Sequence, residues 1–336
     1  LINYAATKDL SLFGPCVARF DIVLADGPYG HEYFKLLAES HIIGIPKYDD
    51  WFNKNIDEAK LYKIKKLLGF SKKTVLYLPT HSGLSSLYKF HGAVSSLADS
   101  YNVLIKLHQH SRLTESSIVQ KLQEDKRVLL FDERDDILPL FALADIVLSD
   151  SSSAMLEAVL IDKPLVILDV ADKQTLARHE LGEEFNGLWY SGGLTYKESV
   201  EQRAKTPEHA AGIVVRDPEN LKEAIKKTFQ SPSRFKENRD RLRQKLYAYN
   251  DGACGERAAK IIREFLKRPK PQPPLLGMAA RSYFTALEKN YKFQTQKKNR
   301  RIKTLEAVNA KLGHEKEKQS RKIDEYTKSK NSEPSL

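Results

Sequence analysis

The sequence predicts an α/β protein built on a parallel β-sheet with helices on both faces. Between residues 73 and 170, runs of Val, Ile and Leu alternate with stretches of helical spacing. Continuous apolar runs are typical of strands buried on both faces, and their alternation with helices is typical of parallel sheets. Such sheets bind ligands in loops at the carboxyl ends of their strands, so we expect a functional site there.

The elements follow one another in a regular order. A helix with an Asn cap, early acids and late lysines is predicted over residues 55–68, ending at Gly69. The predicted strands lie within residues 21–25, 41–49 (closed by Gly44 and Pro46), 73–79, 102–108, 127–132, 145–150 and 164–170. The other predicted helices cover residues 31–39, 88–100, 114–123, 136–144, 153–161, 220–229 and 253–266. Residues 174–211 are polar and contain glycine, which predicts a mobile insertion.

Composition limits the class of protein. The 336 residues are 41% hydrophobic and 29% charged, as in soluble globular proteins. No run approaches the roughly 18 apolar residues that a membrane-spanning helix needs. The two cysteines, Cys16 and Cys254, have no metal-ligand spacing, which favours a reduced, cytosolic setting.

Positive charge is concentrated at the C-terminus. Residues 281–336 hold 15 Lys/Arg and 7 Asp/Glu, so they carry +8 of the net charge of +11. A Pro-rich linker is predicted over residues 267–279 and a basic tail over 280–336, with two short amphipathic stretches separated by "QTQKKNRR" and about twenty disordered residues at the end. A phosphate-rich partner, anionic lipid or nucleic acid, would suit the tail alone.

Three serines lie where a predicted strand meets a predicted helix. Ser151, Ser152 and Ser153 follow Asp150, at a place where free backbone N–H groups and the positive end of the helix dipole favour a phosphate. The alternative is that one serine only caps the helix. Glu157 lies one turn later on the same helix face, where it could accept hydrogen bonds from ribose hydroxyls or simply face solvent.

Two more polar loops are predicted at the same edge of the sheet. The first offers Thr80, His81 and Ser82, and the second offers Lys106, His108 and His110. Hydroxyls, imidazoles and an ammonium at consecutive strand ends would form one polar, cationic rim. The alternative for each histidine is a packed structural role.

At these residues the sequence resembles a known family, the CDP-glycerol glycerophosphotransferases of the teichoic-acid polymerase type. The matching segments, in the family's order, are "GIPKYDDWF", "VLYLPTHS", "VLIKLHQHS", "DILPLFALADIVLSDSSSAMLEAVLIDKPLVIL" and "DGACGERAAKII". The resemblance covers roughly residues 20–266 and implies a GT-B-like fold of two Rossmann-like domains. Residues 1–69 would be an incomplete acceptor-side domain, and residues 70–266 the nucleotide-binding domain.

The resemblance also implies an activity in teichoic acid biosynthesis at the cell envelope. Such an enzyme transfers glycerol phosphate, or a related alditol phosphate, from a CDP-activated donor to a hydroxyl of a lipid-anchored polymer and releases CMP. By position, His108 would be catalytic, stabilising the leaving phosphate. The donor-binding residues would be Thr80, His81, Ser82, Lys106, Ser151, Ser152, Ser153, Glu157 and Arg257.

The sequence departs from the family pattern at several positions. The family usually has Tyr in place of Ser151, Pro in place of Gln109, and an aromatic residue or Arg in place of His81. Its catalytic base comes from a His-Gly motif that residues 1–20 lack, and the chain begins with Leu1. We therefore expect an incomplete N-terminal domain and a chain that binds nucleotide but turns over poorly, with His31 as a weak candidate base.

The expected partners follow from the family. They are CDP-glycerol or a similar CDP-alditol, a lipid-linked polymer acceptor and an anionic membrane surface that binds the basic tail; nucleic acid is not expected. No cofactor and no metal site are predicted, since no Asp-x-Asp motif occurs. The expected location is the cytoplasm, peripheral on the inner face of the cell membrane; alternatively, the tail is only a solvated charged segment.

Three other functions remain open. A GT-B sugar-nucleotide glycosyltransferase or UDP-sugar epimerase would share the serine turn and helical Glu, although epimerases generally have glycines in place of Ser152 and Ser153. A nucleic-acid-binding protein could use the aromatic residues of the basic tail. A non-catalytic relative could bind nucleotide as a scaffold.

Overall fold

A computed structural model describes Leu1 and residues 15–69, 71–81, 85–132, 134–150, 152–170 and 211–330. The chain divides into two compact units, Leu1–Met278 and Ala279–Leu336. The predicted insertion at residues 174–211 lies, except for Ala211, outside the described residues. The finer division into domains at residues 1–69 and 70–266, with a linker over 267–279, stays a prediction.

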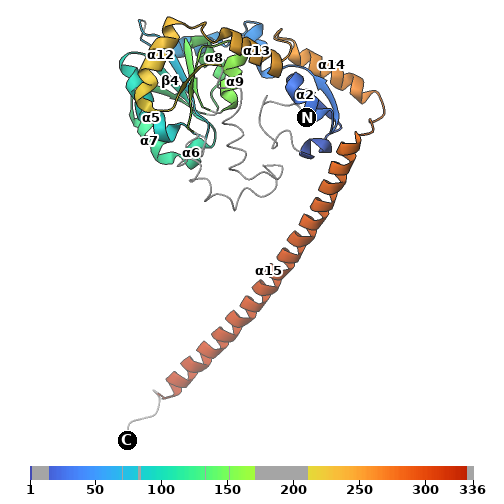
Figure 1. Cartoon of the computed structure of the whole chain (residues 1–336). Coiled ribbons are helices and arrows are strands. Elements are labelled where there is room, and N and C mark those ends of the chain that lie inside the picture. The colour runs from blue at the N-terminus through green and yellow to red at the C-terminus, as the bar shows by residue number, and fades with distance from the viewer. Residues whose placement is uncertain are drawn as a thin grey trace. The chain divides into compact units, whose positions relative to one another are not determined.

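The larger sheet (Figure 1) consists of six parallel strands, and their order is β5-β4-β3-β6-β7-β8. The strands are β3 (Thr74–Leu78), β4 (Asn102–Lys106), β5 (Val128–Phe131), β6 (Ile146–Ser149), β7 (Leu165–Leu168) and β8 (Ile213–Val215). The predicted parallel sheet is therefore confirmed. Strand β8 was missed, because three apolar residues are too short a run to signal a strand.

Alternating strand residues divide the core into two layers. In β3, Val75 and Tyr77 pack with α5 (Leu87–Ser96), α7 (Ser116–Glu124) and α12 (Leu221–Gln230). Leu76 and Leu78 face the opposite layer, which contains α8 (Ile137–Leu143) and α9 (Ser153–Leu160). Because successive side chains of a strand point to opposite faces, continuous apolar runs such as "TVLYL" are needed to fill both layers.

A smaller sheet precedes the larger one. Strands β1 (Ile22–Ala25) and β2 (Glu39–Ile42) are parallel and are joined by α2 (Pro28–Phe34). The second predicted strand, within residues 41–49 and closed by Gly44 and Pro46, begins two residues earlier than expected, at Glu39. Gly44 adopts a φ of +87°, and Pro46 begins the 3₁₀ helix η2 (Pro46–Tyr48), so the strand ends at Ile42.

A crossing segment joins the two sheets. It consists of η2, α3 (Asp49–Phe52) and α4 (Glu58–Lys65). The Tyr48 ring is fully buried and belongs to the core of the larger sheet. The N-cap of α4 is Asp57, whose side chain accepts a hydrogen bond from the Lys60 N–H, rather than the predicted Asn55.

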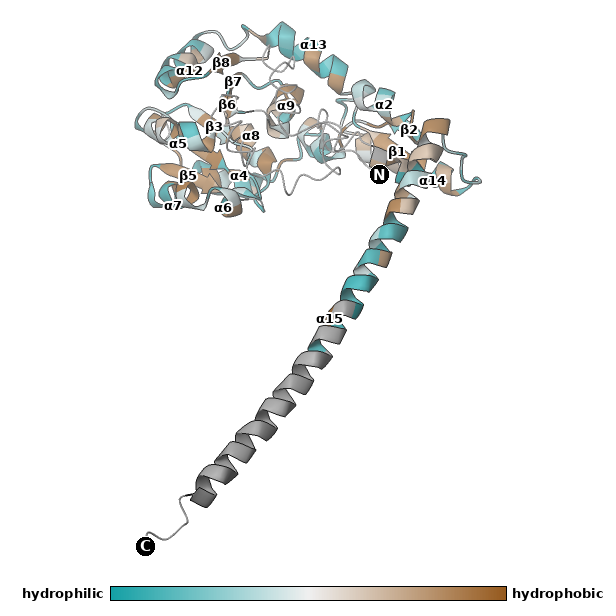
Figure 2. Cartoon of the chain, turned by 60° about the horizontal axis from the view of Figure 1, so that its bottom comes forward, coloured by the Kyte–Doolittle hydropathy of each residue, from teal (hydrophilic) through white to brown (hydrophobic). Residues whose placement is uncertain are grey.

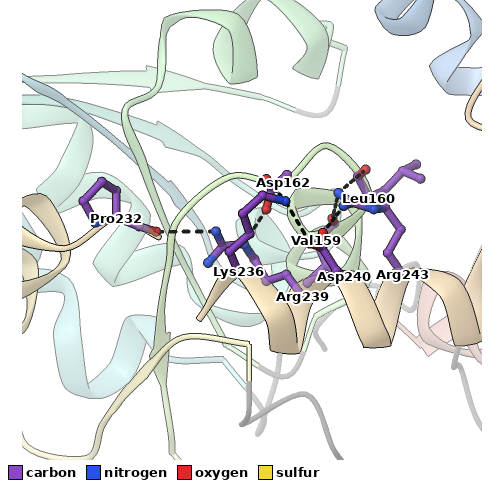
Figure 3. Close-up of polar contacts among 8 residues, drawn as sticks. All are labelled: Val159, Leu160, Asp162, Pro232, Lys236, Arg239, Asp240 and Arg243. Atoms are coloured by element: carbon purple, nitrogen blue, oxygen red, sulfur yellow. Dashed lines mark hydrogen bonds and ion pairs between the residues drawn. The ribbon is translucent and has the colours of Figure 1, made fainter. Parts of the chain in front are cut away.

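Helix α13 (Lys236–Leu246) was missed, because its sequence "KENRDRLRQKL" contains only two apolar residues. Figure 3 shows how its charged side chains serve the end of α9. Arg239 Nε lies 2.8 Å from Oδ1 of Asp162, which adopts a left-handed φ of +56°, and Arg243 approaches the carbonyls of Val159 and Leu160. Cationic groups at a helix C-terminus satisfy its free carbonyls and its dipole.

Two further helices complete the described chain. Helix α14 (Cys254–Leu266) confirms the predicted helix over 253–266, and α15 (Leu275–Lys330) is one continuous helix of 56 residues. The predicted pair of short stretches with a disordered end is therefore wrong up to Lys330. No proline interrupts residues 275–330, and "QTQKKNRR" is polar but favours helix. Figure 2 shows hydrophobic residues in the first turns and mainly hydrophilic ones after them, as far as α15 is coloured.

Candidate functional site

Three histidines gather at the carboxyl edge of the larger sheet. The ring centroids of His81 and His108 are 4.2 Å apart and stacked, and His110 lies 4.9 and 5.4 Å from these two rings. His81 follows β3 and the other two follow β4, and these strands are neighbours. The sequence-based expectation that the two loops meet at one edge is confirmed. We call His81, His108 and His110 the histidine cluster.

The backbone selects a tautomer for His108. The N–H of His110 donates to Nδ1 of His108 at 3.2 Å. A ring nitrogen that accepts a hydrogen bond carries no proton, so the neutral ring has its proton on Nε2. His108 can therefore present an N–H donor to an anion while its other nitrogen is held by the main chain.

Lys106 is engaged at the neighbouring strand end. It is the last residue of β4, and its ammonium donates a 2.5 Å hydrogen bond to the carbonyl of Asp132, which follows β5. The donor-binding role of Lys106 stays a prediction. The contact with Asp132 gives the lysine a structural role as well. The lysine joins the ends of β4 and β5.

The serine turn begins α9. The Ser152 hydroxyl accepts a 3.1 Å hydrogen bond from the Ala154 N–H. Ser152 therefore caps α9, which was the alternative to phosphate binding considered from the sequence. The Ser153 hydroxyl oxygen is buried and has no hydrogen-bond partner among the described residues. A ligand oxygen could supply that partner, since the free N–H groups of this helix end also favour an anion. Ser151 and Ser82 lie outside the described residues.

Asp150, which sequence reasoning gave no role, connects this turn to the loop after β3. Its carboxylate is fully buried and accepts hydrogen bonds from the N–H of Thr80, at 2.9 and 3.0 Å. It also accepts bonds from the N–H and the hydroxyl of Ser86, at 2.9 and 2.8 Å. Burial raises the pKa of Asp150 to about 7. An Asp followed by serines is typical of an exposed turn, so the burial of Asp150 could not be inferred from the sequence.

Glu157 is held by the crossing segment. Its Oε2 accepts hydrogen bonds from Tyr48 Oη at 2.6 Å and from Lys47 Nζ at 2.7 Å. Burial, and secondly Glu157, raise the pKa of Tyr48 well above 10, so the phenol remains a donor. The Glu157 side chain is 13% exposed, which rules out the alternative of a fully solvent-facing glutamate.

Comparison with known proteins gives this site a context. Residues 29–181 match the family described as CDP-Glycerol:Poly(glycerophosphate) glycerophosphotransferase. This matched stretch is slightly less than half of the chain. It includes the histidine cluster, Asp150, the serine turn and Glu157, so the resemblance inferred from the sequence is confirmed.

Relatives of this glycerophosphotransferase family are distant in sequence. A curated relative, "Teichoic acid glycerol-phosphate transferase" of Staphylococcus aureus (strain NCTC 8325 / PS 47), is 22% identical over 262 residues. The alignment covers 73% of this chain and 60% of the relative, so the chain spans about 60% of that protein's length.

Solved structures support the fold. The wall teichoic acid polymerase TagF has a TM-score of 0.51 at 20% identity, covering 76% of this chain and 60% of TagF. A TagF variant soaked with CDPG also has a TM-score of 0.51, at 19% identity, covering 76% of this chain and 59% of that chain. The predicted α/β, GT-B-like fold is confirmed.

Arg257 lies apart from these loops. Its guanidinium donates to the carbonyl of Ile43 at 2.7 Å and to Asp251 at 2.6 Å, and it stacks 3.7 Å from the ring centroid of Tyr249. None of these partners belongs to the histidine cluster or the serine turn. The predicted role of Arg257 in closing the nucleotide site of a glycerophosphotransferase stays a prediction, and its observed contacts brace β2 against α14.

Two further expectations concern groups elsewhere. His31, the weak candidate base, lies in α2 with its Nδ1 3.0 Å from the Ser40 hydroxyl oxygen, and burial lowers its pKa. Over the described residues, no group of three or more His, Cys, Asp or Glu is arranged to hold a metal ion. The absence of a cofactor stays a prediction. No helix in the described part of the chain is long and apolar enough to cross a membrane.

Proposed function

We propose that the chain binds CDP-glycerol, or a similar CDP-alditol, at the carboxyl edge of β3, β4 and β6. It then transfers the alditol phosphate to a hydroxyl of a teichoic acid polymer anchored to lipid, and releases CMP. The observation that carries this proposal is the meeting of the histidine cluster loops with the serine turn, within residues matched to the glycerophosphotransferase family. Imidazole N–H groups, Thr80, the buried Ser153 hydroxyl that has no partner among the described residues, and the start of α9 together suit a diphosphate.

The reaction follows from the chemistry of the diphosphate. The acceptor hydroxyl loses its proton to a base, its oxygen forms a bond to the β-phosphorus, and the bond from that phosphorus to the bridging oxygen breaks. The electron pair leaves with CMP. His108 would donate its Nε2–H to the leaving phosphate, where negative charge develops, and His81 would lie beside it.

Glu157 is proposed to bind the ribose. The hydrogen bonds that its carboxylate accepts from Lys47 and Tyr48 both use Oε2. With Oε2 held by Tyr48 and Lys47, Oε1 can accept hydrogen bonds from ribose hydroxyls one turn after the diphosphate site.

The basic helix α15 is proposed to bind an anionic membrane surface, and the chain is proposed to act in the cytoplasm at the inner face of the membrane. Exposed aromatic residues accompany the lysines and arginines, including Tyr283, Tyr291 and Phe293. A lipid-anchored acceptor requires the enzyme to work at that surface. Each basic residue near anionic lipid contributes about 1 kcal/mol.

Ligand binding tests the proposal most directly. Thermal shift and calorimetry with CDP-glycerol, CDP-ribitol and UDP-sugars should show stabilisation by the CDP compounds, and CMP should appear when a lipid-linked acceptor is added. Stabilisation by UDP-sugars alone would overturn the assignment in favour of a sugar-nucleotide enzyme. CDP binding without CMP release would favour a non-catalytic scaffold.

A further inference from the structure

Strand β6 carries a carboxylate at each end, and both carboxylates bind the backbone of β3. At the amino end, Oδ2 of Asp145 accepts the N–H of Thr74 at 2.8 Å. At the carboxyl end, Asp150 accepts the N–H of Thr80. The two side chains therefore brace the same pair of strands. Asp150 does so at the edge of the sheet that carries the candidate site, and Asp145 at the opposite edge.

The two braces differ in their electrostatic cost. Asp145 is 35% exposed and forms a 3.0 Å ion pair with Lys73. Asp150 is completely buried, and in the part of the chain that the structure describes no Lys, Arg or His lies within ion-pair distance of it. Burying a carboxylate without a cation is unfavourable, and hydrogen bonds only partly offset the loss of water. A contact that served stability alone could use the arrangement of Asp145, in which partial exposure and a cation lower the desolvation cost.

Asp150 holds both ends of one loop. Thr80 and Ser86 bracket the loop between β3 and α5, and one carboxylate accepts hydrogen bonds from both of them. Tyr77 Oη lies 2.6 Å from Ser86 Oγ, and the hydroxyl of Ser149 donates to the Leu78 carbonyl at 2.7 Å. Since Ser86 donates its proton to Asp150, Tyr77 must donate to Ser86, which completes a chain of hydrogen bonds ending on the carboxylate.

We infer that Asp150 is a positioning residue for the donor site, which fixes the loop carrying Thr80 and His81 against the turn carrying Ser152 and Ser153. The inference rests on the proposed function for its ligand, a CDP-activated donor. Asp150 touches no reacting atom in this role. Its effect is to arrange the diphosphate-binding groups before the ligand arrives, which lowers the ordering cost of binding.

The titratable neighbours of Asp150 are few. Tyr77 of β3 has a pKa well above 10, because of burial first and then the charge of Asp150, so it stays a donor. Glu115, at the start of α7, is buried and also raises the pKa of Tyr77. His81 follows Thr80 directly, and His108 and His110 stack with it. A pH experiment must therefore separate Asp150 from three imidazoles.

The test compares the full chain with D150N and with D145N as the matched control. In D150N, an NH₂ group replaces one of the two carboxylate oxygens, so the Thr80 N–H and the two Ser86 donors are left with a single acceptor oxygen. Affinity for CDP-glycerol should fall roughly tenfold at a pH of about 8. The ratio of wild-type to D150N affinity should shrink toward one as pH falls below about 7, because protonated Asp150 resembles Asn. The D145N variant should melt earlier than wild type and keep donor affinity within about twofold.

Amide hydrogen exchange gives a readout that needs no ligand. Exchange at the Thr80 and Ser86 amides should speed up about tenfold or more in D150N, whereas D145N should affect Thr74 instead. Should D150N fail to fold, S86A removes only one donor to the carboxylate and should lower affinity about threefold to fivefold.

The outcomes are separable. A wild-type chain that binds neither CDP nor CDP-glycerol would refute the proposed function, while the exchange measurement would still decide the positioning role. Unchanged exchange and unchanged donor affinity in D150N would overturn the inference. An equal loss of affinity in D145N would also overturn it, because the effect would then be one of general stability.

Discussion

The hydroxyl of Tyr48 donates a 2.6 Å hydrogen bond to Oε2 of Glu157, joining two side chains that are 109 positions apart. Tyr48 belongs to the crossing segment and Glu157 to the helix that starts at the serine turn. The bond fixes the glutamate by a donor that cannot ionise near neutral pH, because burial and the glutamate itself raise the phenol's pKa. The crossing segment thereby helps to shape the proposed nucleotide site.

Replacing Tyr48 by Phe tests this relationship. Y48F leaves the buried ring and removes only the hydroxyl, so Glu157 loses a charge-assisted hydrogen bond of roughly 1.5–3 kcal/mol. We expect affinity for CDP-glycerol to fall about tenfold, measured by calorimetry. Y62F, which changes a tyrosine that is 59% exposed on α4, is the control and should bind like wild type. Equal affinity of Y48F and wild type would contradict the ribose role of Glu157.

The pKa of Asp150 predicts how stability depends on pH. Its folded-state pKa of about 7 lies above the ordinary value of 3.8, so the folded state holds the proton more tightly. The stability due to this group is full below a pH of about 4 and is lost as pH rises through about 7. A shift of about three units corresponds to about 4 kcal/mol.

Urea unfolding across this pH range measures the effect. In D150N this contribution is absent, so the difference in unfolding free energy between D150N and wild type should grow in favour of the variant as pH rises. A difference that stays flat with pH would show that Asp150 titrates outside the range. The same variant is expected to lose donor affinity, so stability and binding should change in opposite directions at high pH.

Arg239 is predicted to stabilise the end of α9 (Figure 3). Its side chain is 3% exposed and pairs with Asp162, whose side chain is 30% exposed. Removing Arg239 takes away the buried, shorter contact and leaves Asp162 with Lys236 at 3.4 Å, so R239A should lower the unfolding free energy by about 1.5–3 kcal/mol. R241A changes an exposed arginine on the same helix and should cost less than about 0.5 kcal/mol, as judged by urea unfolding. Similar losses in both variants would refute the pairing argument.

His108 is expected to act in turnover more than in folding. H108A removes the proposed Nε2–H donor to the leaving phosphate, so kcat for CMP release should fall by about a hundredfold or more. His91 on α5 bonds the Leu87 carbonyl within its own helix, and H91A should keep wild-type kcat. A fall in melting temperature with unchanged kcat would instead assign His108 a structural role.

The sequence predicted the main sheet well and its details less well. Apolar runs of four or five residues, such as Val128–Phe131 and Leu165–Leu168, identify strands that are covered on both faces. In contrast, α13 is held to the end of α9 by the Arg239–Asp162 ion pair and by hydrogen bonds from Arg243 to backbone carbonyls, and no hydrophobic period reveals such a helix. The single helix α15 was missed because a gap in an amphipathic pattern does not interrupt backbone hydrogen bonding.

The parts of the site that depend on strand order could be predicted from the sequence, whereas the burial of individual side chains could not. Neighbouring parallel strands bring His81 and His108 together, and this follows from strand order alone. The burial of Asp150, the capping by Ser152 and the separate position of Arg257 depend on packing between segments far apart in sequence. Sequence spacing contains no signal for these contacts.

The charge of α15 predicts membrane binding that depends on lipid composition. Lys297, Lys298 and Arg300 are exposed on α15, and their change to Glu reverses three charges without adding a helix breaker. Pelleting with vesicles that contain anionic lipid should fall steeply for this variant, since each lost cation removes about 1 kcal/mol and each new anion adds repulsion. Vesicles of neutral lipid should bind neither protein.

A matched variant separates the helix from overall charge. K121E, K222E and K226E make the same change of net charge on exposed positions of α7 and α12. This variant should pellet with anionic vesicles like wild type if α15 provides the membrane contact, and both variants should keep their affinity for CDP-glycerol. Equal loss of pelleting in the two variants would assign membrane binding to total charge and remove the specific role of α15. Loss of oligonucleotide binding in the α15 variant, with vesicle binding intact, would instead identify nucleic acid as the tail's partner.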